Sequence, residues 1–311
     1  MNNQQLLELL YQMSGQELMY REDERIWTNE GTPAWNATRT VESLTDTAVI
    51  PFLHRLLEEN SKEESFKRNI YFMLGKIGSN TGDTRVVDVL IERLDMETNK
   101  YTLSSILDQI AEQDKVPECT PIIKWIQDDR WLVRHSAILA LKKCNSEASE
   151  TALLGVIKNS SDANDLCYAM ASLCKAGSAR SIPYLLTRLE HDQGEVRSAV
   201  IRALDALGDS SHLPIFIEAL KDRSPAVKSY AVTAIHHHGD DTAVDAVLTR
   251  VKKMLSRKRK WESDDLILAL DFLSRYKDDH HQIQNLILWI KTKKYDYLFD
   301  EEKQRVLSFS L

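Results

Sequence analysis

Six positively charged side chains lie within nine residues and form the densest chemical cluster of the sequence. They are Lys252, Lys253, Arg257, Lys258, Arg259 and Lys260, with no acidic residue among them and with Trp261 directly after them. Such a segment can bind phosphates or an acidic protein surface, and an exposed tryptophan adds a stacking face. A solvated helix end is the alternative, because basic residues in a last turn interact favourably with the helix dipole.

Two groups of histidines stand beside acidic residues. One is the run of three at 236–238, which Gly239 and two aspartates follow, and the other is the Asp-Asp-His-His run at 278–281. A metal ion needs ligands that converge on one point, whereas consecutive helical residues point about 100° apart. The chain has no HExxH or similar ligand spacing. We therefore expect no metal site and assign the first run to a helix end.

The sequence shows no nucleophile or cofactor motif. Its four cysteines are Cys119, Cys144, Cys167 and Cys174. They form no CxxC pair and no zinc spacing, so we expect buried thiols in a reducing compartment and no disulfide framework. There is no GxGxxG or GxxxxGK[ST] phosphate loop, and no serine, cysteine or lysine can be paired with a base from spacing. We predict that the protein is not an enzyme and has no catalytic residue or cofactor.

Composition indicates helices and a location outside the membrane. Ten glycines and seven prolines in 311 residues are few for a chain built on tight turns. Forty basic and 47 acidic side chains give a net charge of −7, so the whole chain has no electrostatic reason to seek nucleic acid. No basic start followed by an apolar run and no apolar stretch of about 18 residues occurs, which favours a cytoplasmic protein.

Nine-residue segments with one shared pattern recur along the chain. They are FKRNIYFML (66–74), TLSSILDQI (102–110), VRHSAILAL (133–141), DLCYAMASL (165–173), VRSAVIRAL (196–204) and VKSYAVTAI (227–235). Successive segments end 36, 31, 32, 31 and 31 residues apart. With few exceptions, such as Gln109 and Asp165, their first, fifth, eighth and ninth positions are apolar or small, which is the stripe of a helix buried along one side. We predict that each is the second helix of a helix pair.

Upstream apolar stripes predict the first helix of most pairs. Prolines at positions 51, 121, 183 and 214 fit the opening turn of a helix, where a missing N–H group loses no bond. Glycines fit the ends of second helices, where we expect the left-handed conformation. These are Gly78, Gly177, Gly208 and Gly239. Beyond Asp240 we expect a longer pair near Thr242 to Ser256 and Trp261 to Tyr276, then a degenerate pair near Gln282 to Leu311.

The repeated segments resemble the HEAT-repeat family, in particular its short bacterial type with a Val-Arg-x-x-Ala-Ile-x-Ala-Leu second helix. The resemblance covers about Ser43 to Asp240. It implies an all-α fold, a right-handed α–α superhelix of about seven to eight helix pairs, and a role as an interaction surface. It also implies a ladder between units that joins an aspartate to a basic residue six positions later. The matching pairs here are Asp128 with Arg134 and Asp222 with Lys228.

The N-terminal 42 residues do not fit the repeat. Trp27 and Trp35 lie in a polar stretch there, after helix-like runs at Gln4 to Met13 and Gln16 to Asp23. The segment is either a binding loop or a cap over the open end of the first repeat, which a stacked array needs. We predict a helical cap that continues into the solenoid of residues 43–311 as one domain.

Partner-binding candidates follow from the geometry of the resembling family, in which second helices line the concave surface. The third and seventh positions of each nine-residue segment should point into it, and they are mixed in polarity. Such a mixture suits a protein partner better than a phosphate backbone. The candidates are Arg68, Phe72, Asp108, His135 and Arg202, joined by Trp27, Trp35 and the basic segment 252–260. The alternative is that they are only the solvated faces of amphipathic helices.

We therefore predict a non-catalytic protein-binding solenoid, such as an adaptor, a regulator or a toxin-neutralising immunity protein. Deoxyhypusine hydroxylase resembles this architecture but carries His-Glu pairs for iron, and no His-Glu dipeptide occurs here. HEAT-like alkylpurine DNA glycosylases carry a stretch similar to Trp125 to Arg134, in which Arg134 would touch DNA. The tryptophan-rich segment of that family is missing, because Lys100 to Ser104 has no tryptophan. Nucleic-acid binding through Arg134 and residues 252–260 is the alternative function.

Overall fold

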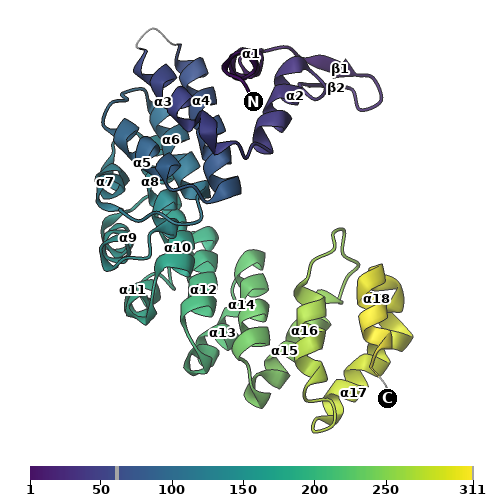
Figure 1. The fold of residues 1–311 in the computed structure, drawn as a ribbon. Helices are drawn as coiled ribbons and strands as arrows, with labels where there is room; N and C mark the ends of the chain where they lie inside the picture. Colours follow the sequence, from purple (N-terminus) through teal and green to yellow (C-terminus); the bar gives the residue numbers. More distant parts are fainter. Residues whose placement is uncertain (60–62, 310–311) are drawn as a thin grey trace. The chain divides into compact units, whose positions relative to one another are not determined.

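The computed structural model describes residues 1–59 and 63–309. In this part the chain forms 18 α-helices and one two-stranded sheet, which confirms the all-α prediction (Figure 1). The chain divides into two compact units. The N-terminal unit comprises Met1–Ser160 with Ala171–Ala176, and the C-terminal unit comprises Ser161–Met170 with Gly177–Leu311. None of the described helices combines the length and apolar composition that crossing a bilayer requires.

The N-terminal unit begins with two helices and a hairpin, and continues as helix pairs. The first part comprises α1 (Asn3–Met13), β1 (Met19–Arg21), β2 (Ile26–Thr28) and α2 (Pro33–Glu42). The pairs are α3 (Ile50–Glu58) with α4 (Glu64–Thr81), α5 (Arg85–Leu94) with α6 (Lys100–Glu112), and α7 (Thr120–Ile123) with α8 (Trp131–Ala140), followed by α9 (Glu147–Asn159). Helix α10 (Ala163–Ala176) contributes residues to both units.

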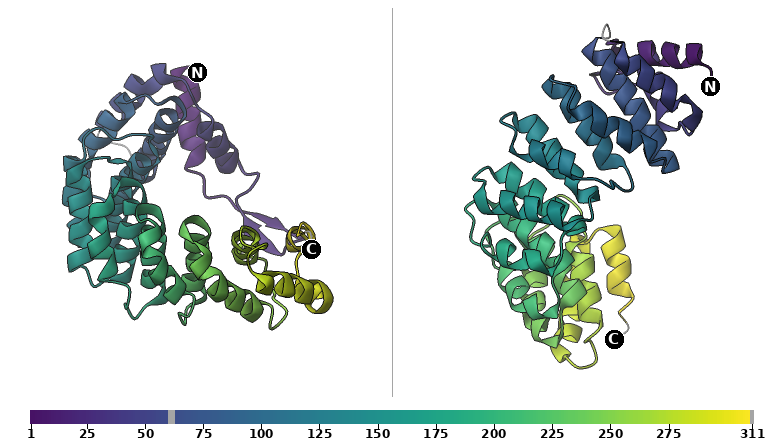
Figure 2. Two further views of the ribbon diagram at one scale, coloured as in Figure 1. Left: turned by 90° about the horizontal axis from the view of Figure 1, so that it is seen from below. Right: turned by 60° about the vertical axis from the view of Figure 1, so that its left-hand side comes forward.

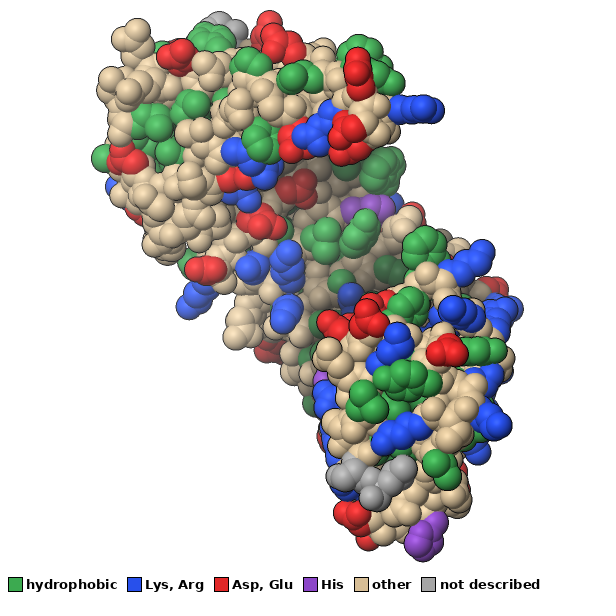
Figure 3. Space-filling view, turned by 90° about the vertical axis from the view of Figure 1, so that its right-hand side faces the viewer, with side chains coloured by type: hydrophobic (Ala, Val, Ile, Leu, Met, Phe, Trp, Pro, Cys, Tyr) green, Lys and Arg blue, Asp and Glu red, His purple; other side chains and the backbone are tan. Residues whose placement is uncertain are grey.

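Besides its part of α10, the C-terminal unit contains four further helix pairs. They are α11 (Ile182–Leu186) with α12 (Gly194–Leu207), α13 (Leu213–Ala219) with α14 (Pro225–His238), α15 (Val244–Met254) with α16 (Asp265–Ser274), and α17 (His281–Trp289) with α18 (Asp300–Leu307). The last two pairs lie close to the predicted positions. Figure 3 shows many Lys and Arg side chains over the part of this unit that faces the viewer.

All six nine-residue segments lie on second helices, as predicted. They fall on α4, α6, α8, α10, α12 and α14, with only Leu141 just beyond the end of α8. Their apolar stripe forms the core: on α12, for example, Val196, Val200 and Leu204 are fully buried. Second helices pack side by side, as α4, α6 and α8 in one unit and α12, α14 and α16 in the other (Figure 2). Each unit thus presents a face made of neighbouring second helices.

The first helices begin with a repeated local device. Proline occupies the first turn of α3, α7, α11 and α13, which confirms the prediction for all four positions. A short 3₁₀ turn precedes α3, α11, α13 and α15, and each turn begins with a side chain that accepts a backbone N–H bond. The accepting residues are Asp46, Ser178, Asp209 and Asp240. Such caps contribute about 1 kcal/mol each.

The prediction of left-handed glycines at the helix ends is wrong. Among described residues, the glycines with positive φ are Gly31 (84°) and Gly82 (71°), and Gly82 ends α4 four residues after Gly78. Gly208 follows α12 with a φ of −91°. A Cβ atom there would lie 2.6 Å from the Leu204 carbonyl oxygen, so close packing rather than φ requires the glycine.

The prediction of a helix at Gln16 to Asp23 is wrong. This segment enters an antiparallel hairpin in which β1 pairs with β2, with Tyr20 opposite Trp27 and their rings 5.3 Å apart. Aromatic and β-branched residues favour a pleated strand, and Arg25 closes the turn with a φ of 56°. The hairpin stands away from α1 and α2 (Figure 2). Trp35 lies on α2 rather than in a loop.

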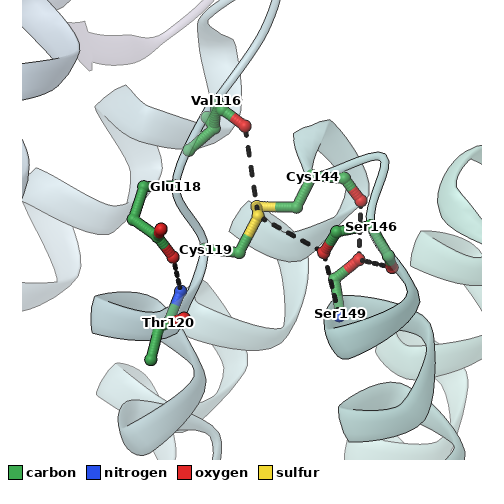
Figure 4. Close-up of a disulfide and its surroundings, with 7 residues drawn as sticks. All are labelled: Val116, Glu118, Cys119, Thr120, Cys144, Ser146 and Ser149. Atoms are coloured by element: carbon green, nitrogen blue, oxygen red, sulfur yellow. Dashed lines mark hydrogen bonds between the residues drawn. A yellow bond between two sulfur atoms is a disulfide. The ribbon is translucent and has the colours of Figure 1, made fainter.

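Cys119 and Cys144 are joined by a disulfide, so the expectation of four thiols is wrong (Figure 4). Cys119 directly precedes α7, and Cys144 follows the 3₁₀ turn that ends α8. The two helices are antiparallel partners, so the start of the first and the end of the second lie together, with the Cα atoms 6.0 Å apart. A separation of 25 residues carries no motif that would have revealed this pairing. Cys167 and Cys174 lie outside this disulfide.

Candidate functional site

A hollow lies on the face that α4, α6 and α8 form in the N-terminal unit. Its volume is about 380 Å³. The lining residues are Arg68, Tyr101, Ser104, Ser105, Asp108 and Leu132. Two of the predicted partner-binding residues, Arg68 and Asp108, therefore meet at one place, although they belong to different repeats. We name this surface the α4–α6–α8 face.

Hydrogen bonds fix the polar floor of the hollow. Ser104 and Ser136 are both buried, and their hydroxyl groups share a bond of 2.9 Å. Ser104 also donates to a carboxylate oxygen of Asp108 at 3.5 Å. Protein packed around this carboxyl group raises its pKa, while hydrogen bonds from the two serines oppose the rise. Asp108 therefore presents a partly desolvated acceptor on an otherwise accessible surface.

Aromatic side chains stand exposed at the same face. Tyr101 is 54% exposed and lines the hollow, and Trp131 is 61% exposed beside the lining residue Leu132. Exposed tyrosine, tryptophan and arginine are the residues that most often dominate a protein–protein interface. Neither aromatic residue was among the predicted candidates. Tyr101 lies three residues before Ser104, on the same side of its helix, so the periodicity of the segment could have indicated it.

Two predicted residues of the same unit lie outside the hollow. His135 is only 8% exposed, and its ring lies 5.6 Å from that of Trp131. We therefore assign His135 to the support of Trp131 rather than to the surface. Phe72 is half-buried on α4, and the Lys76 ammonium lies 5.4 Å from its ring centre.

Arg202 belongs to the C-terminal unit. It lies on α12, and its guanidinium group is 5.9 Å from the ring centre of Tyr230 on the neighbouring α14. This contact between second helices links adjacent repeats. Arg202 is not among the residues that line the hollow beside Arg68 and Asp108.

The two N-terminal tryptophans occupy different settings. Trp27 is 68% exposed on β2, and other large apolar residues in and directly before the hairpin are also exposed. These are Leu18, Met19, Tyr20 and Ile26. Trp35 is half-buried on α2, with the Arg39 guanidinium 5.5 Å from its ring centre. The structure gives Trp35 a packing role and leaves Trp27 accessible.

The basic segment divides into three parts. Lys252 and Lys253 lie in the last turn of α15, as a helix-end interpretation requires. Arg259 has a structural partner, because its guanidinium binds the fully buried carboxylate of Glu302 on α18 and lies 5.2 Å from the ring centre of Phe299. Arg257, Lys258 and Lys260 are exposed on the loop that follows α15.

The predicted ladder exists with different partners. Asp222 pairs with Arg197 of the preceding repeat and not with Lys228, at an Nε–Oδ2 distance of 2.7 Å. The Asp128 carboxylate binds Arg130, also at 2.7 Å. Arg134, the basic residue of the first predicted pair, donates a hydrogen bond to the backbone carbonyl oxygen of Asp128 in its own repeat, at 2.8 Å. The six-residue spacing therefore identified a contact of Arg134 with Asp128, although through the backbone carbonyl rather than the carboxylate, and it was wrong for Lys228, because Asp222 pairs with Arg197.

The histidine run at 236–238 anchors the end of α14. His237 lies 2.8 Å from a carboxylate oxygen of Asp205 on α12, and His238 lies 2.9 Å from the carbonyl oxygen of the same residue. The ring of His238 also stacks on Phe216 at 5.8 Å. Burial lowers the pKa of His236, and the nearby charge of Arg275 lowers it further. These contacts agree with the predicted helix-end role.

The stacked helix pairs define the class of helical repeat proteins. Comparison with known proteins identifies the type of repeat. Residues 150–222 match the family model described as HEAT repeats, which confirms that the chain contains HEAT repeats. This range includes the Arg197–Asp222 contact. No curated protein matches the chain.

Several solved structures are similar in fold. The complex of CpcE and CpcF of phycocyanin lyase from Nostoc sp. PCC7120 matches at 16% identity and a TM-score of 0.47, covering 72% of this chain and 93% of that one. Human deoxyhypusine hydroxylase matches at 12% identity and a TM-score of 0.35, covering 76% and 96%. An engineered protein matches at 15% identity and a TM-score of 0.46, covering 99% and 88%. At these values the similarities carry no inference about function.

Proposed function

We propose that the chain is a non-catalytic protein-binding module that holds a protein partner on the α4–α6–α8 face. An adaptor, a regulator and a toxin-neutralising immunity protein are the forms of such a module that the sequence favours. The observation that carries the proposal is the convergence of Arg68, Tyr101 and Asp108, from two helices, around one hollow. The cytoplasmic location stays a prediction of the sequence.

The chemistry of this face suits a protein. An arginine and an aspartate give the hollow both signs of charge, whereas a phosphate backbone is bound by basic side chains alone. Leu132 and Tyr101 add apolar area, which a partner can cover together with Trp131. Aromatic and arginine anchors surrounded by polar groups are the usual composition of an interface centre.

The alternative function, nucleic-acid chemistry through Arg134, receives less support. The guanidinium group of Arg134 donates to the carbonyl oxygens of Asp128 and Asp129, at 2.8 and 3.4 Å. The corresponding residue of a later repeat, Arg197, makes the same kind of bonds to His191 and Asp192. In both repeats the arginine binds carbonyl oxygens five and six residues before it. These bonds stabilise the fold and explain the arginine at this position without a nucleic-acid ligand.

Capture from the native cell, repeated with surface variants, tests the proposal. The full chain with a C-terminal tag is compared with the double variant Arg68→Ala/Tyr101→Ala and with Glu58→Ala, which changes an exposed residue of α3 in the same unit. We expect a partner that the wild type and Glu58→Ala retain and that the double variant loses by about tenfold or more. Equal recovery by all three proteins would show that this face does not hold the partner.

A further inference from the structure

A second, larger hollow lies in the C-terminal unit. The first turn of α14, the end of α15 and the loop between α15 and α16 enclose about 800 Å³. Basic residues line it from all three elements, namely Lys228, Arg250, Lys253, Arg257, Lys258, Arg259 and Lys260. The loop itself projects beyond the ends of the neighbouring helices (Figure 1). We name this site the basic hollow.

The arginines at its wall already hold carboxylates. Arg250 pairs with Asp265 at 3.3 Å, and Asp265 also accepts a hydrogen bond from Ser229. Arg259 holds the buried Glu302. In both arginines the Nε atom is buried and has no hydrogen-bond partner within the described residues. The carboxylates therefore hold both guanidinium groups in position at the wall of the basic hollow.

Five further cations have no acidic partner. Among the residues that the structure describes, no carboxylate lies within 4.0 Å of Lys228, Lys253, Arg257, Lys258 or Lys260. Burial lowers the pKa of Lys228, and the charges of Arg250 and Lys253 lower it further. Like charges held together in this way repel one another, so a bound anion would stabilise the cluster.

An apolar surface lies among these charges. Trp261 is 82% exposed, and Met254 and Pro225 line the hollow beside it. The alkyl stems of the lysines extend the same surface. The volume falls within the range of about 300–1,000 Å³ that is typical of ligand sites. Such a site fits a few residues of peptide and leaves no room for a folded domain.

Acidic residues limit the positive region. Glu262 follows Trp261, and its pKa is raised by burial and by the negative charges of Glu301, Glu302 and Asp300. A nucleic-acid strand carries a charge on every nucleotide and needs a basic track along its length. Here the track would end at Glu262. A ligand whose negative charge is confined to a short stretch avoids this repulsion.

We propose that the basic hollow binds a short acidic peptide segment, whose aspartate or glutamate side chains meet the unpaired lysines and whose apolar side chain packs on Trp261. The proposal rests on the proposed function only in assigning that segment to a protein partner. The basic hollow lies in the C-terminal unit and the α4–α6–α8 face in the N-terminal unit. Either surface can therefore fail its test while the other passes.

Titration of the full chain with synthetic peptides tests the proposal directly. The probe is a ten-residue peptide with six Asp or Glu residues around one Phe, and its control replaces each acid by Asn or Gln. We expect the acidic peptide to bind in calorimetry, the neutral control to fail, and affinity to fall with added salt because exposed charge pairs are screened. The variant Arg68→Ala/Tyr101→Ala keeps this affinity, which separates the test from that of the proposed function.

Two double variants of equal charge change locate the site. Lys258→Glu/Lys260→Glu alters the basic hollow, whereas Lys115→Glu/Lys293→Glu alters exposed lysines elsewhere. We expect the first to weaken peptide binding by about tenfold or more and the second to leave it within about twofold, with both variants still folded. Trp261→Ala should also weaken binding.

Three results would overturn the proposal. The first is absence of binding by the wild type, and the second is an equal loss in both double variants. The third is tighter binding of a single-stranded oligothymidylate than of the acidic peptide, abolished by Lys258→Glu/Lys260→Glu. That last result would assign the basic hollow to nucleic acid instead.

Discussion

Arg197 on α12 and Asp222 beyond the end of α13 form a two-pronged ion pair, with distances of 2.7 and 2.8 Å between their nitrogen and oxygen atoms. The same guanidinium group donates to the carbonyl oxygens of His191 and Asp192, at 2.6 and 3.0 Å. One side chain thus ties the loop before its own helix to the next repeat. Arg134 makes the corresponding bonds to backbone in an earlier repeat.

Replacing Arg197 by methionine should therefore destabilise the C-terminal unit. The change keeps the aliphatic packing but leaves Asp222, whose side chain is largely buried, without its cation. We expect a loss of about 2–3 kcal/mol in the free energy of unfolding, measured by urea denaturation. Lys221→Met is the matched control, because its pair with Glu218 is exposed and should change stability by less than about 0.5 kcal/mol. Equal effects of the two substitutions would show that the Arg197–Asp222 pair does not stabilise the C-terminal unit.

The same pair should make stability depend on pH. Hydrogen bonds from Arg197 lower the pKa of Asp222. Near this pKa the folded state therefore binds fewer protons at the Asp222 carboxyl group than the unfolded state does. A carboxyl with a lowered pKa stabilises the fold above its ordinary value of about 3.9 and loses that contribution as the pH falls further. We expect the stability difference between wild type and Arg197→Met to shrink below about pH 4. A difference that stays constant from pH 7 to pH 3 would show that Asp222 is not the titrating group.

Cys119 and Cys144 provide a test of the disulfide. A cross-link between residues separated by 25 positions restricts the unfolded chain and should contribute about 3 kcal/mol. We expect the double variant Cys119→Ser/Cys144→Ser, or reduction of the wild type, to lower the melting temperature, whereas Cys167→Ser has a smaller effect. Thiol labelling of the denatured, unreduced chain should find two reactive cysteines. Four would support the original expectation of free thiols.

Arg259 and Arg257 should respond differently to the same substitution. Arg259→Met leaves the carboxylate of Glu302 buried without its cation, which typically costs about 3–5 kcal/mol. Arg257 has no acidic partner among the described residues, so Arg257→Met should leave the free energy of unfolding nearly unchanged. Chemical denaturation of the two variants measures the difference. Similar losses would mean that Glu302 does not depend on Arg259.

The regular repeats were predictable because their helices are specified locally. Each nine-residue segment carries its own buried stripe, and four of the first helices, α3, α7, α11 and α13, carry proline in their opening turn. The hairpin was not predictable from that periodicity, because three-residue strands are too short to show alternation. The glycines after α12 and α14 were placed correctly, but close packing against the preceding turn, rather than backbone twist, explains them.

The candidate sites depend on contacts between repeats, and sequence alone captured them only in part. Arg68 and Asp108 were expected on one face and do share a hollow. Lys228 and Arg250 were not associated with the basic segment, because helix packing brings them beside the loop. The burial of His135 likewise follows from its neighbours, since its position within the segment is the same as that of the half-buried Arg68.

The hairpin also affects how copies of the chain behave in solution. Within the described residues its sheet has only two strands, so each strand has one edge whose backbone groups are free to pair with another extended chain. The turn between the strands carries Glu22, Asp23 and Glu24, and equal charges on two copies oppose such pairing. Salt screens that repulsion. We therefore expect self-association, followed by light scattering, to rise with ionic strength and to fall when Trp27 is replaced by lysine.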